Sequence, residues 1–461
     1  MTATIQPLHP VDDPRPPEFA DDALALAFAE RYADDLRYVA LWNLWLTWTG
    51  TYWAQDETLA VFDRARRINR EIAERALRPG GTKAKRVATA IASAKAVAAT
   101  LSLARSDRRI AATTEQWDRD PFALCTPEGI VDLRSGVLRP ALPEDYATRS
   151  TSVAPAPPGA TSPLWMTFLA RVMDGNTELV GYLQRVAGYA LTGETKEHAL
   201  WFAHGTGRNG KGVFLNTLSR ICGTYAAVSA METFVSSGSS QHPTDLAMLR
   251  GARLVTSQET EDGRRWAESK IKAMTGGDPI TARYMRQDFF TFDPQFKLII
   301  AGNHKPGLRG VDEAVRARFN LVPFSVTIPQ AERDTDLPEK LKAEWPAILR
   351  WAIDGCLDWQ RTGLRPPDAV RAATADYLAE EDAFSLWLTE CTERRDWSRE
   401  NTADLFASWR RWAEAAGEFV GSQKRFSQSL QARGFTPKRQ SGTGKMGFEA
   451  IGLRRPAYDQ N

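Results

Sequence analysis

The chain has 461 residues, of which 43% are apolar and 25% are charged, and its formal net charge is +2. This length predicts about three domains of roughly 150 residues each, and the near-neutral charge excludes a uniformly basic surface, so nucleic-acid binding would need local patches. The 4 cysteines and 5 histidines show no metal-ligand spacing. Neither a secretory segment nor an 18-residue apolar run is present, so we expect a cytoplasmic protein with no membrane partner.

The N-terminal third is predicted to form a flexible arm followed by a mixed α+β module. Residues 1–20 are rich in Pro and Asp, which is typical of a flexible arm. Residues 21–154 combine helices with a few strands, including alanine-rich helical runs over 83–105 and a hairpin turn at 127–129. Four tryptophans are expected to pack in the core rather than to stack on bases: Trp42, Trp45, Trp48 and Trp53.

A linker and an amphipathic segment follow the module. Residues 155–163 are rich in Pro, Gly, Ser and Thr and predict a linker. Residues 164–194 carry apolar side chains at helical spacing and predict a helical collar. We expect the next domain to span residues 195–345.

A glycine-rich loop at residues 205–212 is the most informative motif. An apolar stretch at 199–203 precedes it and a helical pattern follows it. Strand, glycine loop and helix is the context of a phosphate-binding loop, where backbone N–H groups and the helix N-terminus attract an anion and a lysine supplies a mobile charge. A nucleoside triphosphate suits this geometry best, while the structural alternative is a simple glycine-rich turn. The candidate nucleotide-binding residues are Gly205, Thr206, Gly207, Arg208, Asn209, Gly210, Lys211, Gly212 and Val213.

One loop position departs from the usual pattern. A Ser or Thr normally follows the lysine and binds magnesium through its hydroxyl, but here the residue is Gly212. Either Thr206, Thr217 or water fills that ligand position, or the metal is bound more weakly.

Polar residues follow two further predicted strands. The strand at 254–256 leads into Gln258 and Glu259, and Glu259 is the candidate to hold a metal or orient the attacking water. Gln258 stands where a metal-binding Asp often precedes the glutamate, and the alternative is a solvated acidic turn. The strand at 296–301 ends near Asn303, which could bond the γ-phosphate or its water. Arg318 precedes another apolar strand and could act as an arginine finger.

Between these strands the sequence predicts a helix, a Gly-Gly break at 276–277 and a hairpin. Its tip carries Arg283, Tyr284 and Arg286. Cations for phosphates and flat groups for bases suit single-stranded nucleic acid. An ordinary surface hairpin with solvated arginines is the alternative.

The C-terminal part is predicted to be a separate DNA-binding domain. Residues 346–369 predict a connecting helix, and 370–461 predict helix, helix and hairpin, the order of a winged helix. Cations dominate from residue 421 onward, and DNA backbone phosphates are their natural partner. The candidate contacts are Lys424, Arg425, Arg433 and Lys445. A basic, solvated C-terminus without a ligand is the alternative.

The order of these parts resembles superfamily 3 helicases, and more closely the poxvirus-type primase-helicase proteins of phages, plasmids and satellite elements. The motifs that carry the resemblance are the loop at 205–212, the block from Lys272 through 276–278 to Arg283, Asn303, and Arg318 before 322–324. Segments 35–56 and 126–136 resemble that family's N-terminal module. One further departure is Ala317, where the family often has a second arginine; Arg316 is displaced by one place.

The resemblance implies an α/β fold with an AAA+-like P-loop core, using ATP and Mg2+. By it, Lys211 binds phosphate, Glu259 is the acidic second motif, Asn303 is the polar sensor and Arg318 acts from a neighbouring subunit. Lys272 belongs to the same family block and is expected near DNA.

The sequence therefore predicts a replicative DNA helicase that translocates on single-stranded DNA as a homo-oligomeric ring, expected to be a hexamer, in a bacterial host. We see no carboxylate pair with a nearby His for a primase, so a separate primase is expected. A replication initiator or packaging-type ATPase without unwinding remains open. A small-molecule P-loop kinase is disfavoured by the basic tail and the Arg318 segment.

Overall fold

The computed structural model describes residues 15–236, 243–258, 264–286, 288–308, 313–380, 383–395, 398–439 and 446–454. Of the predicted site residues, Glu259 and Lys445 lie outside these ranges. Contacts along the chain divide it into two units. The first comprises residues 1–155 with 222–225, and the second comprises the remainder.

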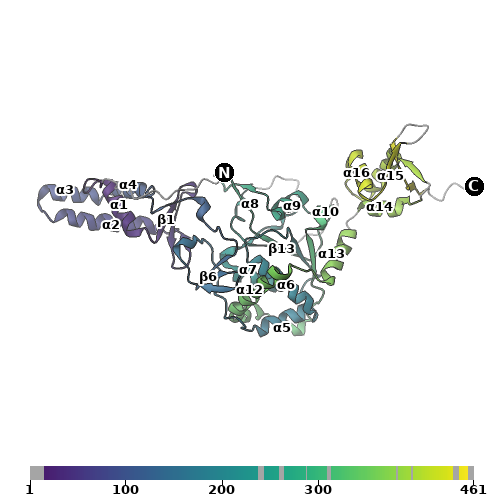
Figure 1. Cartoon of the computed structure of the whole chain (residues 1–461), viewed down its shortest axis with the longest axis horizontal. Coiled ribbons are helices and arrows are strands. Elements are labelled where there is room, and N and C mark those ends of the chain that lie inside the picture. The colour runs from purple at the N-terminus through teal and green to yellow at the C-terminus, as the bar shows by residue number, and fades with distance from the viewer. Residues whose placement is uncertain are drawn as a thin grey trace, which may run out of the picture. The chain divides into compact units, whose positions relative to one another are not determined.

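Helices and a small sheet make up the first part of unit 1 (Figure 1). The helices are α1 (Asp21–Tyr32), α2 (Ala60–Leu77), α3 (Gly81–Ile91) and α4 (Ala94–Ala104), and α2 lies along α3. The strands β1 (Leu36–Val39), β2 (Leu44–Trp48), β3 (Trp53–Gln55) and β4 (Ala111–Ala112) form a sheet in the order β3-β2-β1-β4. Apolar side chains of α2 recur at helical spacing, which places them in one core with α1 and α4.

The tryptophans of this unit pack against aromatic neighbours. The Trp53 side chain is fully buried, and its Nε1 donates to the Pro143 carbonyl oxygen at 2.9 Å. Its ring centre lies 5.5 Å from that of Trp48, and the Trp42 ring centre lies 6.0 Å from that of Trp117. The prediction that these side chains serve packing is therefore confirmed.

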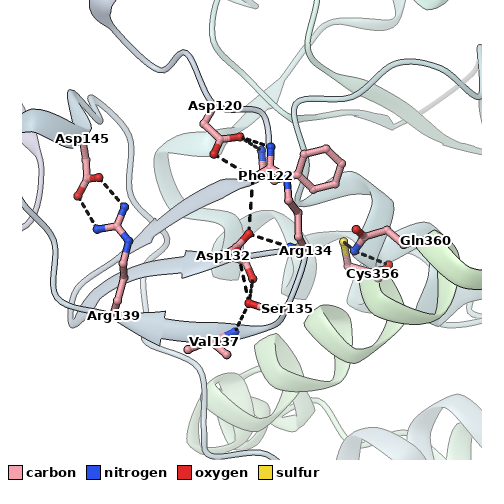
Figure 2. A network of polar contacts seen from close by, with 10 residues as sticks. All are labelled: Asp120, Phe122, Asp132, Arg134, Ser135, Val137, Arg139, Asp145, Cys356 and Gln360. Carbon is pink, nitrogen blue, oxygen red and sulfur yellow. Dashed lines mark hydrogen bonds and ion pairs between the residues drawn. The ribbon is translucent and has the colours of Figure 1, made fainter.

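A second sheet in unit 1 contains β5 (Ala123–Thr126), β6 (Gly129–Asp132) and β7 (Val137–Arg139), all antiparallel. The predicted hairpin turn at 127–129 joins β5 to β6. Figure 2 shows two ion pairs beside this sheet, Arg134–Asp120 at 2.9 Å and Arg139–Asp145 at 2.5 Å. Their arginines are exposed, so each pair contributes at most about 1 kcal/mol.

Unit 2 is built on a parallel five-stranded sheet. Its strands are β8 (Leu200–His204), β9 (Ala226–Val228), β10 (Leu254–Gln258), β13 (Lys297–Gly302) and β14 (Phe319–Pro323), in the order β14-β8-β13-β10-β9. The interior strands read as continuous apolar runs because both faces of a parallel sheet are covered. The carboxyl ends of β8, β13 and β10 meet at one edge, since Gly302 pairs with His204 and Ala301 with Gln258.

Helices pack around this sheet. They are α7 (Lys211–Cys222), α8 (Pro243–Ala247), α9 (Glu268–Gly276), α10 (Glu313–Arg316), α11 (Leu337–Leu341), α12 (Trp345–Thr362) and α13 (Asp368–Glu380). The predicted hairpin after the Gly-Gly break is present as β11 (Ile280–Ala282) and β12 (Phe290–Phe292). The α13 helix packs against β14.

The segment 164–194, predicted to be helical, forms two helices with a break between them. These are α5 (Pro163–Val172) and α6 (Thr177–Ala190). The chain breaks between them where Asp174 and Gly175 have φ angles of 52° and 72°, because a left-handed backbone cannot continue a right-handed helix. Asn176 then caps α6 by accepting from the Leu179 amide. The α6 helix packs along α12.

The C-terminal elements have their own core around Trp387, Trp409 and Phe426. The helices are α14 (Ala383–Cys391), α15 (Thr402–Ala415) and α16 (Gln423–Ala432). Strands β16 (Arg399–Asn401), β18 (Met446–Glu449) and β17 (Pro437–Arg439) form an antiparallel sheet in that order, and β15 (Thr392–Glu393) pairs with β19 (Gly452–Leu453). The predicted two helices and hairpin are present, and α14 and β16 add to them.

Among the described residues no single helix is long and apolar enough to cross a membrane. The helices α3 and α4, bent by 57° relative to each other, reach that length and apolarity only when taken together.

Candidate active site

The glycine loop connects β8 to α7 at the carboxyl edge of the parallel sheet. Asn209 ties it to the end of β14, since its Nδ2 donates to the Phe324 carbonyl oxygen at 3.0 Å. A Cβ on Gly205 would lie 2.0 Å from that Nδ2 and 2.2 Å from that oxygen. Only glycine fits there, so the loop's shape depends on Gly205 and on the Asn209 side chain together.

Lys211 is the first residue of α7, and its side chain is 7% exposed. Its Nζ donates to the Gly205 carbonyl oxygen at 2.7 Å, to Oδ1 of Asn209 at 3.0 Å and to Oδ1 of Asn303 at 3.2 Å. Burial lowers the pKa of this ammonium to about 8. Within the described residues its partners are neutral oxygens, so the charge remains available to an anion.

The structure brings Asn303 to the predicted place. It directly follows β13, and the pairing of Gly302 with His204 sets it beside the start of the loop. Its side chain is exposed although its Oδ1 contacts the buried lysine. Lys211 and Asn303 therefore meet in one place, and the exposed Asn303 side chain leaves this place open to solvent.

The residues around Gly212 settle which side chains face it. A Cβ at this position would have Oε1 of Gln258 at 3.7 Å as its nearest neighbour. Gln258 ends β10, and its Nε2 donates to Oδ1 of Asn216 on α7 at 2.9 Å. Thr217 is 4% exposed and lies further along α7, so its hydroxyl is not at this surface. Thr206 is exposed in the loop.

Metal ligation by Glu259 stays a prediction, because this residue lies outside the described ranges. In the part of the chain that the structure describes, no cluster of three His, Cys, Asp or Glu side chains could hold a metal ion.

Arg318 lies at the amino ends of the parallel strands, whereas the loop lies at their carboxyl ends. It precedes β14, whose first residue pairs with Leu200 at the start of β8. Five residues of strand separate the two edges, about 16 Å at the usual rise. Its Nε donates to Oγ1 of Thr275 at 3.1 Å and its Nη1 to the Ala314 carbonyl oxygen at 2.8 Å. The guanidinium is therefore held away from Lys211 of the same chain.

The hairpin residues behave differently from one another. The Tyr284 hydroxyl donates to the Ala247 carbonyl oxygen at 3.2 Å, and its ring stacks on Phe290 at 5.5 Å. Tyr284 thus contacts α8 and Phe290 while staying 37% exposed, and its contact with DNA stays a prediction. Arg286 adopts a left-handed backbone with φ of 60° in the connection between the strands, and Lys272 lies on α9.

Two apolar side chains at this tip were missed from the sequence. Met285 is 65% exposed and Phe289 is 59% exposed, with the Arg283 guanidinium 4.7 Å from the Phe289 ring centre. An exposed flat surface made of arginine and phenylalanine suits a nucleobase. The sequence signal that could have identified them is that Met285 and Phe289 lie on either side of Arg286 in the predicted hairpin tip.

The predicted cations of the C-terminal part also differ in exposure. Lys424 is exposed on α16 and lines a groove with Asn401, Gln423 and Ser427. Arg433 instead lies 4.7 Å from the Phe384 ring centre and donates to the hydroxyl of Ser385 at 3.4 Å. Arg433 therefore packs helix α16 against α14. Arg425 belongs to α16, and its side chain is not described.

Two segments of the chain match known protein families. Residues 25–174 match a family model described as "D5 N terminal like", and residues 203–318 match a family described as of unknown function (DUF5906). The second match runs from the strand before the loop to Arg318.

Two viral proteins illustrate the sequence relationship. The chain is 26% identical over 257 residues to "Putative helicase 022R" of Frog virus 3 (isolate Goorha), covering 51% of this chain and 26% of that protein. It is 24% identical over 320 residues to "Putative helicase L207/L206" of Acanthamoeba polyphaga mimivirus, covering 64% and 33% respectively. The chain thus spans about a quarter to a third of the length of these relatives.

The fold has a counterpart among solved structures. The apo structure of the NrS-1 C-terminal region superposes with a TM-score of 0.51 at 10% identity, covering 93% of this chain and 98% of that one. This likeness extends across nearly the whole chain and concerns the fold. The matched N-terminal model and the viral relatives support a likeness to D5-like primase-helicase proteins, and the solved structure adds a likeness of fold alone.

Proposed function

We propose that this chain is an ATP-dependent replicative DNA helicase of a phage, plasmid or satellite element, with an AAA+-like P-loop core. The observation that carries the proposal is the buried Lys211 ammonium, held by Gly205, Asn209 and Asn303 at the carboxyl edge of a parallel sheet. The loop connects the interior strand β8 to the N-terminus of α7, where backbone amides and the helix dipole both attract phosphate.

In the proposed mechanism the chain's own groups divide the work. Lys211 leaves part of its oxygen cage to bind the outer phosphates of ATP, and Asn303, already beside it, bonds the γ-phosphate or the attacking water. Glu259 would orient that water and hold the metal. When bound, Mg2+ neutralises charge on the phosphate oxygens.

Arg318 needs a second subunit to take part. It lies at the amino ends of the strands, whereas Lys211 of its own chain lies at their carboxyl ends. Arg318 would therefore act on the nucleotide of a neighbouring subunit. This geometry favours a ring in which ATP sits between subunits, which we expect to be a hexamer. Mutual completion of sites would couple hydrolysis to the state of the ring.

Two surfaces would contact DNA. The Arg283–Phe289 pair and Arg286 at the hairpin would follow single-stranded DNA through the channel. The helices α15 and α16 with strands β16 to β18 would act as a winged helix on duplex DNA, with Lys424 facing the backbone.

A strand-displacement assay on forked DNA tests the proposal. Wild-type protein should displace the strand with ATP, whereas Lys211→Ala should neither hydrolyse ATP nor displace it. Glu259→Gln should bind ATP without hydrolysing it. Hydrolysis without displacement would instead support an initiator or packaging-type ATPase, which the groove on the C-terminal elements also suits. Absence of DNA-stimulated hydrolysis would refute both.

A further inference from the structure

Two departures that are 46 residues apart in sequence face each other in space. Gly212 replaces the hydroxyl residue of the loop, and Gln258 replaces the aspartate that often ends the second strand. In the structure, Oε1 of Gln258 is the nearest atom to a Cβ placed on Gly212, at 3.7 Å. The position of the missing side chain therefore has room for a Cβ and is faced by an amide oxygen at ordinary contact distance.

Asn216 sets the direction of that amide. It lies four residues after Gly212 on α7, so both belong to one face of the helix. Its Oδ1 accepts from Nε2 of Gln258 at 2.9 Å, which turns the other end of the Gln258 amide, the oxygen, toward Gly212. The two side chains thus form a bridge from the helix to the end of β10.

The oxygen is of the right chemical kind for the ion that accompanies a nucleotide. Magnesium prefers oxygen ligands, usually keeps several waters and needs few contacts from protein. An amide oxygen is an uncharged metal ligand, as a serine hydroxyl is. The other candidates fit less well, because Thr217 is buried and Thr206 lies at the start of the loop, ahead of its lysine.

We propose that the Gln258 amide oxygen, oriented by Asn216, takes the place of the missing loop hydroxyl toward the Mg2+ bound with the nucleotide. Gln258 is then a ligand-binding residue and Asn216 a positioning residue. This inference rests on the proposed nucleotide binding by the loop and adds to it the identity of the group that compensates for Gly212.

Nucleotide binding at controlled Mg2+ tests it without any turnover. A fluorescent ADP analogue is titrated into the full chain in chelator and in saturating Mg2+. We expect Gln258→Ala to weaken binding about tenfold or more in Mg2+, since losing even a group that only orients a metal ligand typically costs about 10–100-fold, and to leave binding in chelator unchanged. Asn216→Leu should give a smaller loss in Mg2+ alone. Gln55→Ala, an exposed glutamine in unit 1, is the matched control.

The double variant Gly212→Ser/Gln258→Ala provides the decisive comparison. The space at Gly212 admits the serine, so its hydroxyl should restore most of the Mg2+-dependent affinity. Unchanged Mg2+ dependence in Gln258→Ala, equal losses with and without Mg2+, or a double variant without recovery would each overturn the assignment. Failure of the wild type to bind nucleotide under either condition would instead refute the proposed function itself, and this inference with it. Melting curves check that every variant folds.

Discussion

The low pKa of Lys211 gives nucleotide binding a distinctive pH dependence. Burial lowers this pKa from 10.5 to about 8 in the absence of ligand. A phosphate contacts the charged form, so binding should raise the pKa again. Affinity should therefore be highest below the ligand-free pKa and fall as pH rises through it, because an increasing share of the protein must first take up a proton.

The size of the effect follows from the two protonation equilibria. With a pKa of about 8, the apparent dissociation constant should rise about 25-fold between about pH 7.5 and about pH 9.5, whereas a lysine of ordinary pKa would change it by about 1.1-fold. Phosphate groups are fully ionised across this interval, so their own titration adds little.

Calorimetry in buffers of different ionisation enthalpy measures both affinity and proton uptake. Near pH 8 we expect about half a proton to be taken up for each nucleotide bound. Lys211→Arg is the matched control, because a guanidinium does not titrate in this range. Its affinity should be lower, since it cannot reproduce the hydrogen bonds to Gly205, Asn209 and Asn303, but it should vary little with pH. The reasoning would be refuted if the wild-type affinity changed by less than twofold over this pH interval and no proton were taken up.

Other expectations concern assembly and DNA. Arg318→Ala subunits mixed with Lys211→Ala subunits should recover part of the ATPase activity that each lacks alone, and full activity of Arg318→Ala by itself would exclude a finger at this position. Phe289→Ala should lower the base pairs unwound per ATP while ATPase activity is largely kept, and an unchanged ratio would make the hairpin structural. Removing residues 383–461, which keeps α13 with its Tyr377 and Leu378 in the core of the parallel sheet, should weaken duplex DNA binding and flatten its dependence on salt, by about one unit of log–log slope for each DNA phosphate that is no longer bound; equal salt slopes would assign the segment to assembly. Arg433→Ala should lower the melting temperature because its packing on Phe384 is removed, and an unchanged melting temperature with reduced duplex binding would return Arg433 to the DNA surface.

The parallel sheet was predictable because its strands are buried on both faces. Runs such as 199–203 and 296–301 can be read directly, and the glycine loop between a strand and a helix fixes the edge where polar groups gather. The meeting of Lys211 with Asn303 follows from that edge alone. The break at Asp174 and Gly175 was not predicted, because the apolar spacing continues across it and only the backbone angles reveal the turn.

The roles of single cations and aromatics could not be read in the same way. Tyr284 and Arg433 are of the chemical types that bind DNA, and the structure adds that Tyr284 stacks on Phe290 and that Arg433 lies over the Phe384 ring. A sequence gives the chemical type of a side chain but not the neighbour that occupies its flat face. Likewise, the Gln258–Asn216 hydrogen bond depends on how the end of β10 lies beside α7, and the apolar spacing within each element does not specify this.

The placement of the site residues carries a consequence for how activity would be controlled. Lys211 and Asn303 are assembled within one chain, with their hydrogen bonds already formed. Arg318 is held by Thr275 and Ala314 at the other end of strands that are about 16 Å long. A single chain would then be competent to bind nucleotide but poorly equipped to stabilise charge in the transition state. Binding should be a property of the monomer and fast hydrolysis a property of the assembly, so nucleotide affinity should be independent of protein concentration while turnover per subunit rises with it.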